Sequence, residues 1–171
     1  DNETDLSYGG GRLGIQEPAK VVDFNRIAFQ VARSVDGSIR IESSPATSPF
    51  TDYNKRMLDA GLAQYCDVVG THMYGGQLER ADIGILRRWV DEKAPGKPIA
   101  ISEAGAIDSY FPNAADKAAA RADWVRRAAE QAREYKLDSL LLFDWDAHEE
   151  WRMEGTPSIE ALGKAAREVR Y

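Results

Sequence analysis

Short apolar segments alternate with longer amphipathic segments along this chain, and that alternation restricts its possible folds more than any other feature. The short segments fit buried strands, and the longer ones repeat apolar residues at the three- and four-residue spacing of a helix. Strands are expected to begin near residues 39, 67, 98 and 139. Helices are expected over about 17–35, 50–65, 83–94, 116–135 and 158–169.

Four strand–helix units in succession predict a parallel α/β fold, because parallel strands need a long crossover that is usually a helix. The apolar run Leu140–Phe143 is typical of a strand that is covered on both faces. A closed (β/α)8 TIM barrel needs eight such units in roughly 250 residues. The 171 residues hold half that number of units, and residues 1–171 are expected to form a single portion of one domain.

The composition fits a globular protein and excludes several classes of partner. Hydrophobic residues make up 43% of the chain and charged residues 29%, and the net charge is −6. We expect no nucleic-acid partner, which would need a basic patch, and no membrane contact, since no stretch approaches the ~18 apolar residues that span a bilayer. Cys66 is the only cysteine, which excludes an intrachain disulfide and a metal cage built of cysteines. Both a secreted and a cytoplasmic location fit these features.

Polar and aromatic residues follow each expected strand at the point where it ends. In parallel sheets the carboxyl ends of the strands meet at one rim, where reactive residues gather. The four expected ends carry Ser43-Ser44, Thr71-His72-Met73-Tyr74, Ser102-Glu103-Ala104-Gly105 and Asp144-Trp145-Asp146. Asn2-Glu3 precedes the first helix as a further strand end would. Two carboxylates, a His-x-Tyr pair and a tryptophan are therefore expected at one rim.

Such a set of side chains suits the chemistry of sugars. A retaining glycosidase needs two carboxyl groups roughly 5–5.5 Å apart, one protonated to serve the leaving oxygen and one ionised to attack the anomeric carbon. Tyrosine and histidine beside the attacking carboxylate can hold it by hydrogen bonds, and tryptophan offers a flat apolar face to a sugar ring. Glu3 and Glu103 are expected to form the pair, with their carboxyl carbons about 5–6 Å apart.

Four stretches of the chain carry a resemblance to a known group of enzymes. They are Asn2-Glu3, DVVGTHMY at 67–74, IAISEAG at 99–105 and FDW at 143–145. In this order they resemble the ends of strands four, six, seven and eight of the clan-A glycoside hydrolases, which include cellulase-like, mannanase-like and β-xylosidase-like enzymes. Ala60-Gly61-Leu62 is similar to the β-xylosidase-like branch in particular. The resemblance begins at the family's fourth strand, so it implies the C-terminal half of the barrel, with the N-terminal half absent.

The resemblance also implies roles for individual residues. It implies that Glu3 is the general acid/base and Glu103 the nucleophile in a double-displacement hydrolysis of O-glycosidic bonds. The implied substrate contacts are Asn2 at the sugar 2-hydroxyl, Tyr74 and His72 beside the nucleophile, and Trp145 as the floor of the reactive-sugar site. Thr4 stands where a proline is common in the clan. The implied substrate is an oligosaccharide or polysaccharide, and neither a cofactor nor a metal is expected.

Other functions are compatible with parts of the pattern. The chain could be a non-catalytic carbohydrate-binding or scaffold fragment of a TIM-barrel protein, because only half a barrel is present. It could also be a barrel enzyme of other chemistry, such as an aldolase or a metal hydrolase. A Schiff-base enzyme would want a lysine at a strand end, whereas the candidates fall in helices or loops at Lys20, Lys97 and Lys136.

Two further motifs indicate cofactor sites only weakly. An acidic loop carries Asp144, Asp146, His148, Glu149 and Glu150. It lacks the spacing of a helical zinc site, so a solvated loop is the better interpretation. The glycines of 9–14 match the dinucleotide-binding pattern G-x-G-x-x-G at Gly9, Gly11 and Gly14, but no apolar strand precedes them.

The number of strands also predicts open sheet edges. Four strands cannot close a barrel, so the strands near Ile39 and Leu140 should present unpaired backbone groups and apolar faces. We expect another polypeptide to cover these edges. It would be either the N-terminal half of the same enzyme or a second copy of this chain.

Overall fold

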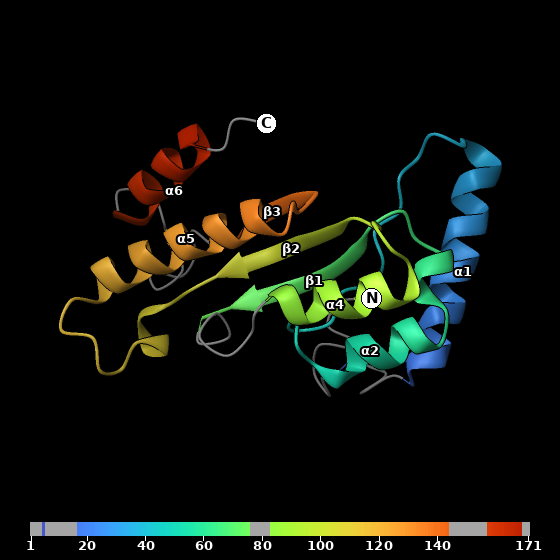
Figure 1. The fold of residues 1–171 in the computed structure, drawn as a ribbon, viewed down its shortest axis with the longest axis horizontal. Coiled ribbons are helices and arrows are strands. Elements are labelled where there is room, and N and C mark those ends of the chain that lie inside the picture. The colour runs from blue at the N-terminus through green and yellow to red at the C-terminus, as the bar shows by residue number, and fades with distance from the viewer. Residues whose placement is uncertain (1–4, 6–16, 76–82, 144–156, 169–171) are drawn as a thin grey trace.

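The computed structural model describes Asp5 and residues 17–75, 83–143 and 157–168. Within these ranges helices and strands alternate (Figure 1). In chain order the elements are α1 (Pro18–Val35), α2 (Asp52–Asp59), η2 (Leu62–Gln64), β1 (Val69–Tyr74), α4 (Ile83–Lys93), β2 (Ile99–Gly105), η3 (Asp108–Tyr110), α5 (Lys117–Glu134), β3 (Ser139–Leu142) and α6 (Pro157–Glu168). The described helices do not include one that is long and apolar enough to cross a membrane.

The strands form one parallel sheet in the order β1-β2-β3. Alternate residues of β1 and β2, among them Val69, Met73 and Ile101, pack against α4 and α5 in the larger of two hydrophobic cores. Trp124 of α5 is fully buried there, and Leu140 and Leu142 of β3 join the same core. Helices on one face of a parallel sheet, reached by successive crossovers, confirm the predicted α/β class.

A smaller core lies beside β1. It consists of Val21 and Val22 from α1, Tyr53 and Met57 from α2, Ala46, and Leu62. Gly61 separates α2 from η2 with a φ of 96°, a left-handed conformation that ends a helix and that glycine adopts readily. The single helix predicted over 50–65 is therefore wrong in length, because the chain turns at Gly61 and continues as a short 3-10 helix.

The strand predicted at residues 39–43 is also wrong as a regular strand. Residues 39–47, the edge segment, run parallel to β1 but form only two isolated bridges, Glu42 to Val68 just ahead of β1 and Ala46 to Thr71 within it. A few backbone hydrogen bonds accompany the bridges, among them that from the N–H of Asp67 to the carbonyl oxygen of Ile41 at 2.7 Å, and side chains add further contacts. The Asp67 carboxylate accepts the backbone N–H of Ile41 at 2.8 Å, and the Ser43 hydroxyl accepts the N–H of Gly70 at 2.9 Å.

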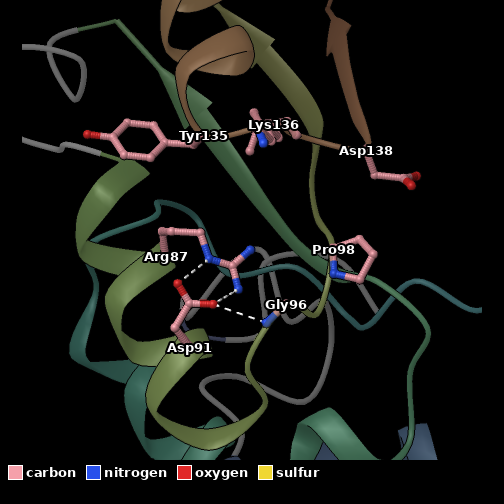
Figure 2. A pocket seen from close by; sticks show the side chains of 8 residues that line it. Arg87, Asp91, Gly96, Pro98, Tyr135, Lys136 and Asp138 are labelled. Atoms are coloured by element: carbon pink, nitrogen blue, oxygen red, sulfur yellow. Dashed lines mark hydrogen bonds and ion pairs between the residues drawn. The ribbon is translucent and has the colours of Figure 1, made fainter. Parts of the chain in front are cut away.

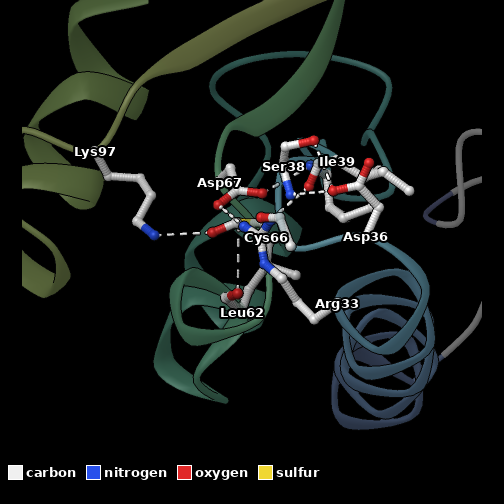
Figure 3. A network of polar contacts seen from close by, with 10 residues as sticks. Arg33, Asp36, Ser38, Ile39, Leu62, Cys66, Asp67 and Lys97 are labelled. Carbon is white, nitrogen blue, oxygen red and sulfur yellow. Dashed lines mark hydrogen bonds and ion pairs between the residues drawn. The ribbon is translucent and has the colours of Figure 1, made fainter.

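Arg33, near the end of α1, completes this side-chain connection (Figure 3). Its guanidinium donates to the backbone oxygens of Gly37 and Ile39 at 2.5 and 2.6 Å, and to the Asp67 carboxylate at 2.5 Å. Lys97, on the other side of Asp67, donates to the carbonyl oxygen of Cys66 at 2.8 Å. The start of the edge segment is thus held by an arginine and an aspartate in addition to the backbone hydrogen bonds that join Ile41 and Ser43 to residues 67 and 68.

Candidate active site

A bulge in β2 determines which residue of that strand lies beside His72 of β1, on the same face of the sheet. The register pairs Thr71 with Ile101 and then His72 with Glu103, so Ser102 is the extra residue. Without the bulge, Ser102 would stand beside His72 and Glu103 would turn to the opposite face. The Ser102 hydroxyl is buried and makes no hydrogen bond to any residue that the structure describes. Bulges of this kind redirect a side chain next to functional sites, and this one brings Glu103 to the face that carries His72.

Glu103 is held by two side chains of β1. The Tyr74 hydroxyl donates a hydrogen bond to Oε2 of Glu103. Nδ1 of His72 lies 3.5 Å from the same oxygen, within ion-pair range when the imidazole is protonated. His72 is completely buried, whereas the Glu103 side chain keeps 30% of its surface exposed. Two buried or half-buried groups therefore fix one carboxylate oxygen of a residue that solvent still reaches.

Ring packing fixes the direction of the Tyr74 hydroxyl. The Tyr74 ring meets His72 edge-on at 6.1 Å between centroids and Phe143, just beyond β3, at 6.3 Å. Edge-to-face geometry at such separations is a favourable arrangement of aromatic rings. Residues from β1 and from the end of β3 thus enclose the tyrosine, whose hydroxyl reaches β2 between them.

Gly75 follows Tyr74, the last residue of β1, at a position that does not fit a larger residue. Its φ is +35°, and an added Cβ would collide with the ring of Tyr110. Its carbonyl oxygen accepts a hydrogen bond of 2.7 Å from the indole N–H of Trp124, and its own N–H donates to Gly105 at 2.8 Å. The backbone that carries Tyr74 is therefore fixed from β2, from α5 and from η3.

Asp5 is attached to the same end of the sheet. Its carboxylate accepts the backbone N–H of Thr47 at 3.0 Å and the Thr47 hydroxyl at 2.7 Å. Thr47 follows Ala46, which bridges to Thr71 just before His72. This contact was not predicted from the sequence. A carboxylate two residues after Glu3 and a hydroxyl residue just beyond an expected strand are the only sequence signals of it.

Three of the six predicted site residues lie outside the described residues: Asn2, Glu3 and Trp145. The predicted separation of Glu3 and Glu103 therefore stays a prediction. The structure brings the other three together, since His72, Tyr74 and Glu103 are in contact. Their catalytic roles also remain predictions at this point.

Among the described residues, no three His, Cys, Asp or Glu side chains gather in a way that could hold a metal ion. The acidic loop at 144–150 and the glycines of 9–14 are outside those residues.

A hollow of about 550 Å³ lies at the opposite ends of the strands (Figure 2). Its lining includes Pro98, which precedes β2, and Asp138, which precedes β3. The Arg87–Asp91 ion pair forms part of the wall at 2.6 Å. The amino-terminal ends of barrel strands usually serve stability, so this hollow is not part of the candidate site around Glu103.

The fold matches solved structures, although no family model and no curated protein matches the sequence. The GH39 β-xylosidase from Caulobacter crescentus superposes with a TM-score of 0.65 at 17% identity, covering 97% of this chain and 40% of that one. An endo-β-1,4-mannanase from Thermotoga petrophila gives 0.64 at 13% identity, covering 88% and 40%. An α-L-arabinofuranosidase from Thermotoga maritima gives 0.63 at 15% identity, covering 95% and 38%.

These comparisons concern the fold. The chain is similar to TIM-barrel glycoside hydrolases of clan A, and it spans only part of their length, 40% for the β-xylosidase. Partial coverage, a parallel sheet and alternating helices together confirm the predicted half-barrel fold.

Proposed function

We propose that this chain carries the nucleophile side of a retaining glycoside hydrolase site, with Glu103 as the nucleophile and Glu3 as the general acid/base. The observation that supports this most is the contact of Glu103 with both Tyr74 and His72 at the carboxyl ends of adjacent parallel strands. That end of a barrel is where catalytic residues collect. The shared fold with several glycosidases adds support from an independent source.

The geometry around Glu103 suits a carboxylate that acts as a nucleophile. Both contacts are made by Oε2 of Glu103, so within the described residues Oε1 has no hydrogen-bond partner. In the proposed first step Oε1 bonds to the anomeric carbon while the bond to the leaving oxygen breaks and Glu3 gives that oxygen a proton. In the second step Glu3 takes a proton from water, whose oxygen displaces Glu103 and releases the sugar with its configuration retained.

Asp5 supports the assignment of Glu3. The two hydrogen bonds with Thr47 attach the chain two residues after Glu3 to the strand end beside β1. A rigid attachment near a catalytic group limits its movement relative to the nucleophile. Asn2 at the sugar 2-hydroxyl and Trp145 beneath the reactive sugar complete the proposed site, and an oligosaccharide or polysaccharide is its proposed substrate.

Covalent trapping tests the nucleophile directly. A 2-deoxy-2-fluoro glycosyl fluoride slows the second step, so a retaining enzyme accumulates the glycosyl-enzyme. Xylosyl, mannosyl and glucosyl versions should be incubated with the protein, followed by peptide mass spectrometry. We expect the label on Glu103 and none in Glu103→Gln, while the exposed control Glu130→Gln labels normally. A label on another carboxylate would refute the assignment.

Azide distinguishes the two carboxylates. Glu103→Ala should lose about 10³-fold or more in turnover of an aryl glycoside. Azide should then restore activity and give a glycosyl azide of inverted configuration, because it replaces the missing nucleophile. Removal of an acid/base gives a glycosyl azide of retained configuration instead, so that product from Glu103→Ala would exchange the two roles.

The alternative is a chain that binds sugar without turnover, and it follows from the partial coverage of the glycosidase structures. Calorimetry with xylo- and manno-oligosaccharides separates the two functions. Binding that Glu103→Gln leaves unchanged, in a protein that the fluoro sugars never label, would favour the binding function.

A further inference from the structure

An exposed tyrosine lies at the carboxyl ends of the strands, beside the candidate site but outside it. The ring of Tyr110, in η3, rests against the backbone of Gly75, where an added Cβ would collide with it. Gly75 follows Tyr74, whose hydroxyl holds Glu103. Tyr110 nevertheless stays 40% exposed. Part of its ring is therefore fixed against the sheet, and the rest is open to a ligand.

The short helix η3 that carries Tyr110 is firmly attached. The N–H of Tyr110 donates to the carbonyl oxygen of Ile107 and that of Phe111 to Asp108, both at 3.0 Å. Phe111 packs against the larger core. The Asp108 carboxylate lies 3.3 Å from Nε of Arg121 in α5. A ring on such a fixed segment loses little conformational freedom when a ligand binds, and this favours affinity.

Tyr110 contacts the sheet further along the strands than Glu103 does. Glu103 pairs with His72, and Gly75, against which the ring lies, stands three residues beyond His72. Gly75 continues the ladder, since its N–H donates to the carbonyl oxygen of Gly105. Three residues of extended chain measure about 10 Å. A sugar ring on Tyr110 is therefore not the ring that Glu103 attacks but one that lies a unit or two away along an oligosaccharide.

We propose that Tyr110 is the platform of a second sugar subsite, which binds a ring one or two units from the reactive sugar. The proposal rests on the proposed function in taking a sugar chain as the ligand, and it favours oligosaccharides over single glycosides. The flat apolar face of the tyrosine suits the C–H face of a sugar ring. Asp108, on the same short helix and with 45% of its side chain exposed, can accept hydrogen bonds from the hydroxyl groups at the edge of that ring.

Binding as a function of chain length tests the subsite without any need for turnover. The full chain is titrated by calorimetry with xylo-, manno- and cello-oligosaccharides, from the monosaccharide to the hexasaccharide. We expect the dissociation constant to fall about three- to tenfold at the length that first reaches Tyr110, which is the gain that aromatic stacking supplies. Tyr110→Ala should remove this step. Tyr110→Phe should keep it, because the ring face and not the hydroxyl makes the contact.

A matched control and a direct signal separate binding from structure. Phe24→Ala removes a similarly exposed ring from α1, and the arrowheads of β1 and β2 point away from that helix (Figure 1), so it should keep the step. If Tyr110→Ala loses stability in urea, Tyr110→Leu retains an apolar contact with Gly75 and should still lack the step. With fluorotyrosine incorporated, the fluorine resonance that is missing from Tyr110→Phe should shift only with oligosaccharides long enough to show the step.

Three outcomes would overturn the proposal. The parent chain could show no step with length, Tyr110→Ala could weaken every length equally, or Tyr110→Phe could lose the step as fully as Tyr110→Ala. Labelling by the fluoro sugars remains a separate test, because those reagents are single sugars. A label on Glu103 without a step would support the proposed function and refute the subsite. A step that depends on Tyr110 in a chain that is never labelled would support the subsite and refute the nucleophile.

Discussion

The two sides of β1 are built from different interactions. On one side β2 pairs with it along its whole length, from Val69 to Tyr74, above the larger hydrophobic core. On the other side the edge segment forms two isolated bridges and a few backbone hydrogen bonds, and side chains of Asp67, Ser43 and Arg33 add further contacts. The first side carries Glu103, which solvent reaches, against the buried His72 and the half-buried Tyr74, and the second side holds Asp5. The proposed active site therefore joins a rigid ladder to a boundary that depends on individual side chains.

The largest effect is expected on the ladder side. Ile101 is fully buried in the larger core, so Ile101→Ala should lower the free energy of unfolding by about 2–5 kcal/mol, through lost burial and the cavity that remains. Urea unfolding followed by tryptophan fluorescence measures this. Ile39→Ala, at an exposed position of the edge segment, serves as the control and should change little. Equal losses in the two variants would mean that the two sides do not differ in packing.

Gly70 tests how closely the edge segment approaches β1. A Cβ at this position would stand 2.8 Å from the carbonyl oxygen of Ser43 and 2.9 Å from Cγ of Glu42. Gly70→Ala should therefore cost about 1–3 kcal/mol, because the backbone of the edge segment has to move. Gly37→Ala meets no atom within 4 Å and is the matched control. A neutral Gly70→Ala, measured by the same urea assay, would show that the edge segment gives way freely.

The two sides of β1 also differ in how much of their structure can be predicted from the sequence. The strands of the ladder follow from runs such as Leu140–Phe143, because burial in a parallel sheet selects continuous apolar residues. The edge segment has an alternating pattern at Ile39-Arg40-Ile41, which also predicts a strand. However, Asp67 binds the N–H of Ile41 from 26 residues further along the chain, and Arg33 binds the carbonyl oxygen of Ile39 from 6 residues before it. Such contacts depend on the folded arrangement of side chains, and no local pattern specifies them.

The structure of the candidate site can likewise be predicted only in part from the sequence. The proximity of His72, Tyr74 and Glu103 follows from one rule, that parallel strands end at one rim. The bulge at Ser102 does not follow from the sequence, although it decides which face Glu103 occupies. A bulge arises from the fit of one strand to its neighbours, so the alternation of β2 by itself would place Ser102 and not Glu103 beside His72.

Asp67 should matter less than Gly70 but more than an ordinary surface ion pair. It joins Arg33 to the N–H of Ile41 and is about three-quarters covered, with 26% of its side chain exposed. Asp67→Ala should cost about 1–2 kcal/mol, since a charge-assisted hydrogen bond and a backbone N–H lose their acceptor. Hydrogen exchange should show the loss at Ile41 and Ser43 first. Glu130→Ala, which breaks an exposed pair within α5, should cost only a few tenths of a kcal/mol. Exchange that accelerates equally in β2 would contradict a local role.

The smallest expected effect concerns Asp59, which connects the two sides through helices. Asp59 of α2 pairs with Lys93 of α4 at 2.7 Å and with Lys55 of its own helix at 2.9 Å. Hydrogen bonds from Lys93 and then Lys55 lower the pKa of Asp59 from 3.8 to about 2. A carboxyl whose pKa is lower in the folded protein stabilises it above pH 3.8, and that contribution disappears as the pH falls through about 2.

Asp59→Asn should therefore be slightly less stable than the parent protein at pH 6 and equally stable near pH 2, because the parent loses its advantage across that acid range. Urea midpoints at four pH values between 6 and 2 measure the convergence. The effect should be small and weaken at high salt, since the carboxylate is 40% exposed and its pairs are screened. Lys93→Gln, which removes the contact between the two helices, should reproduce more of the difference than Lys55→Gln, which removes a contact within α2. A difference between parent and Asp59→Asn that persists unchanged to pH 2 would mean that Asp59 acts through packing and not through its charge.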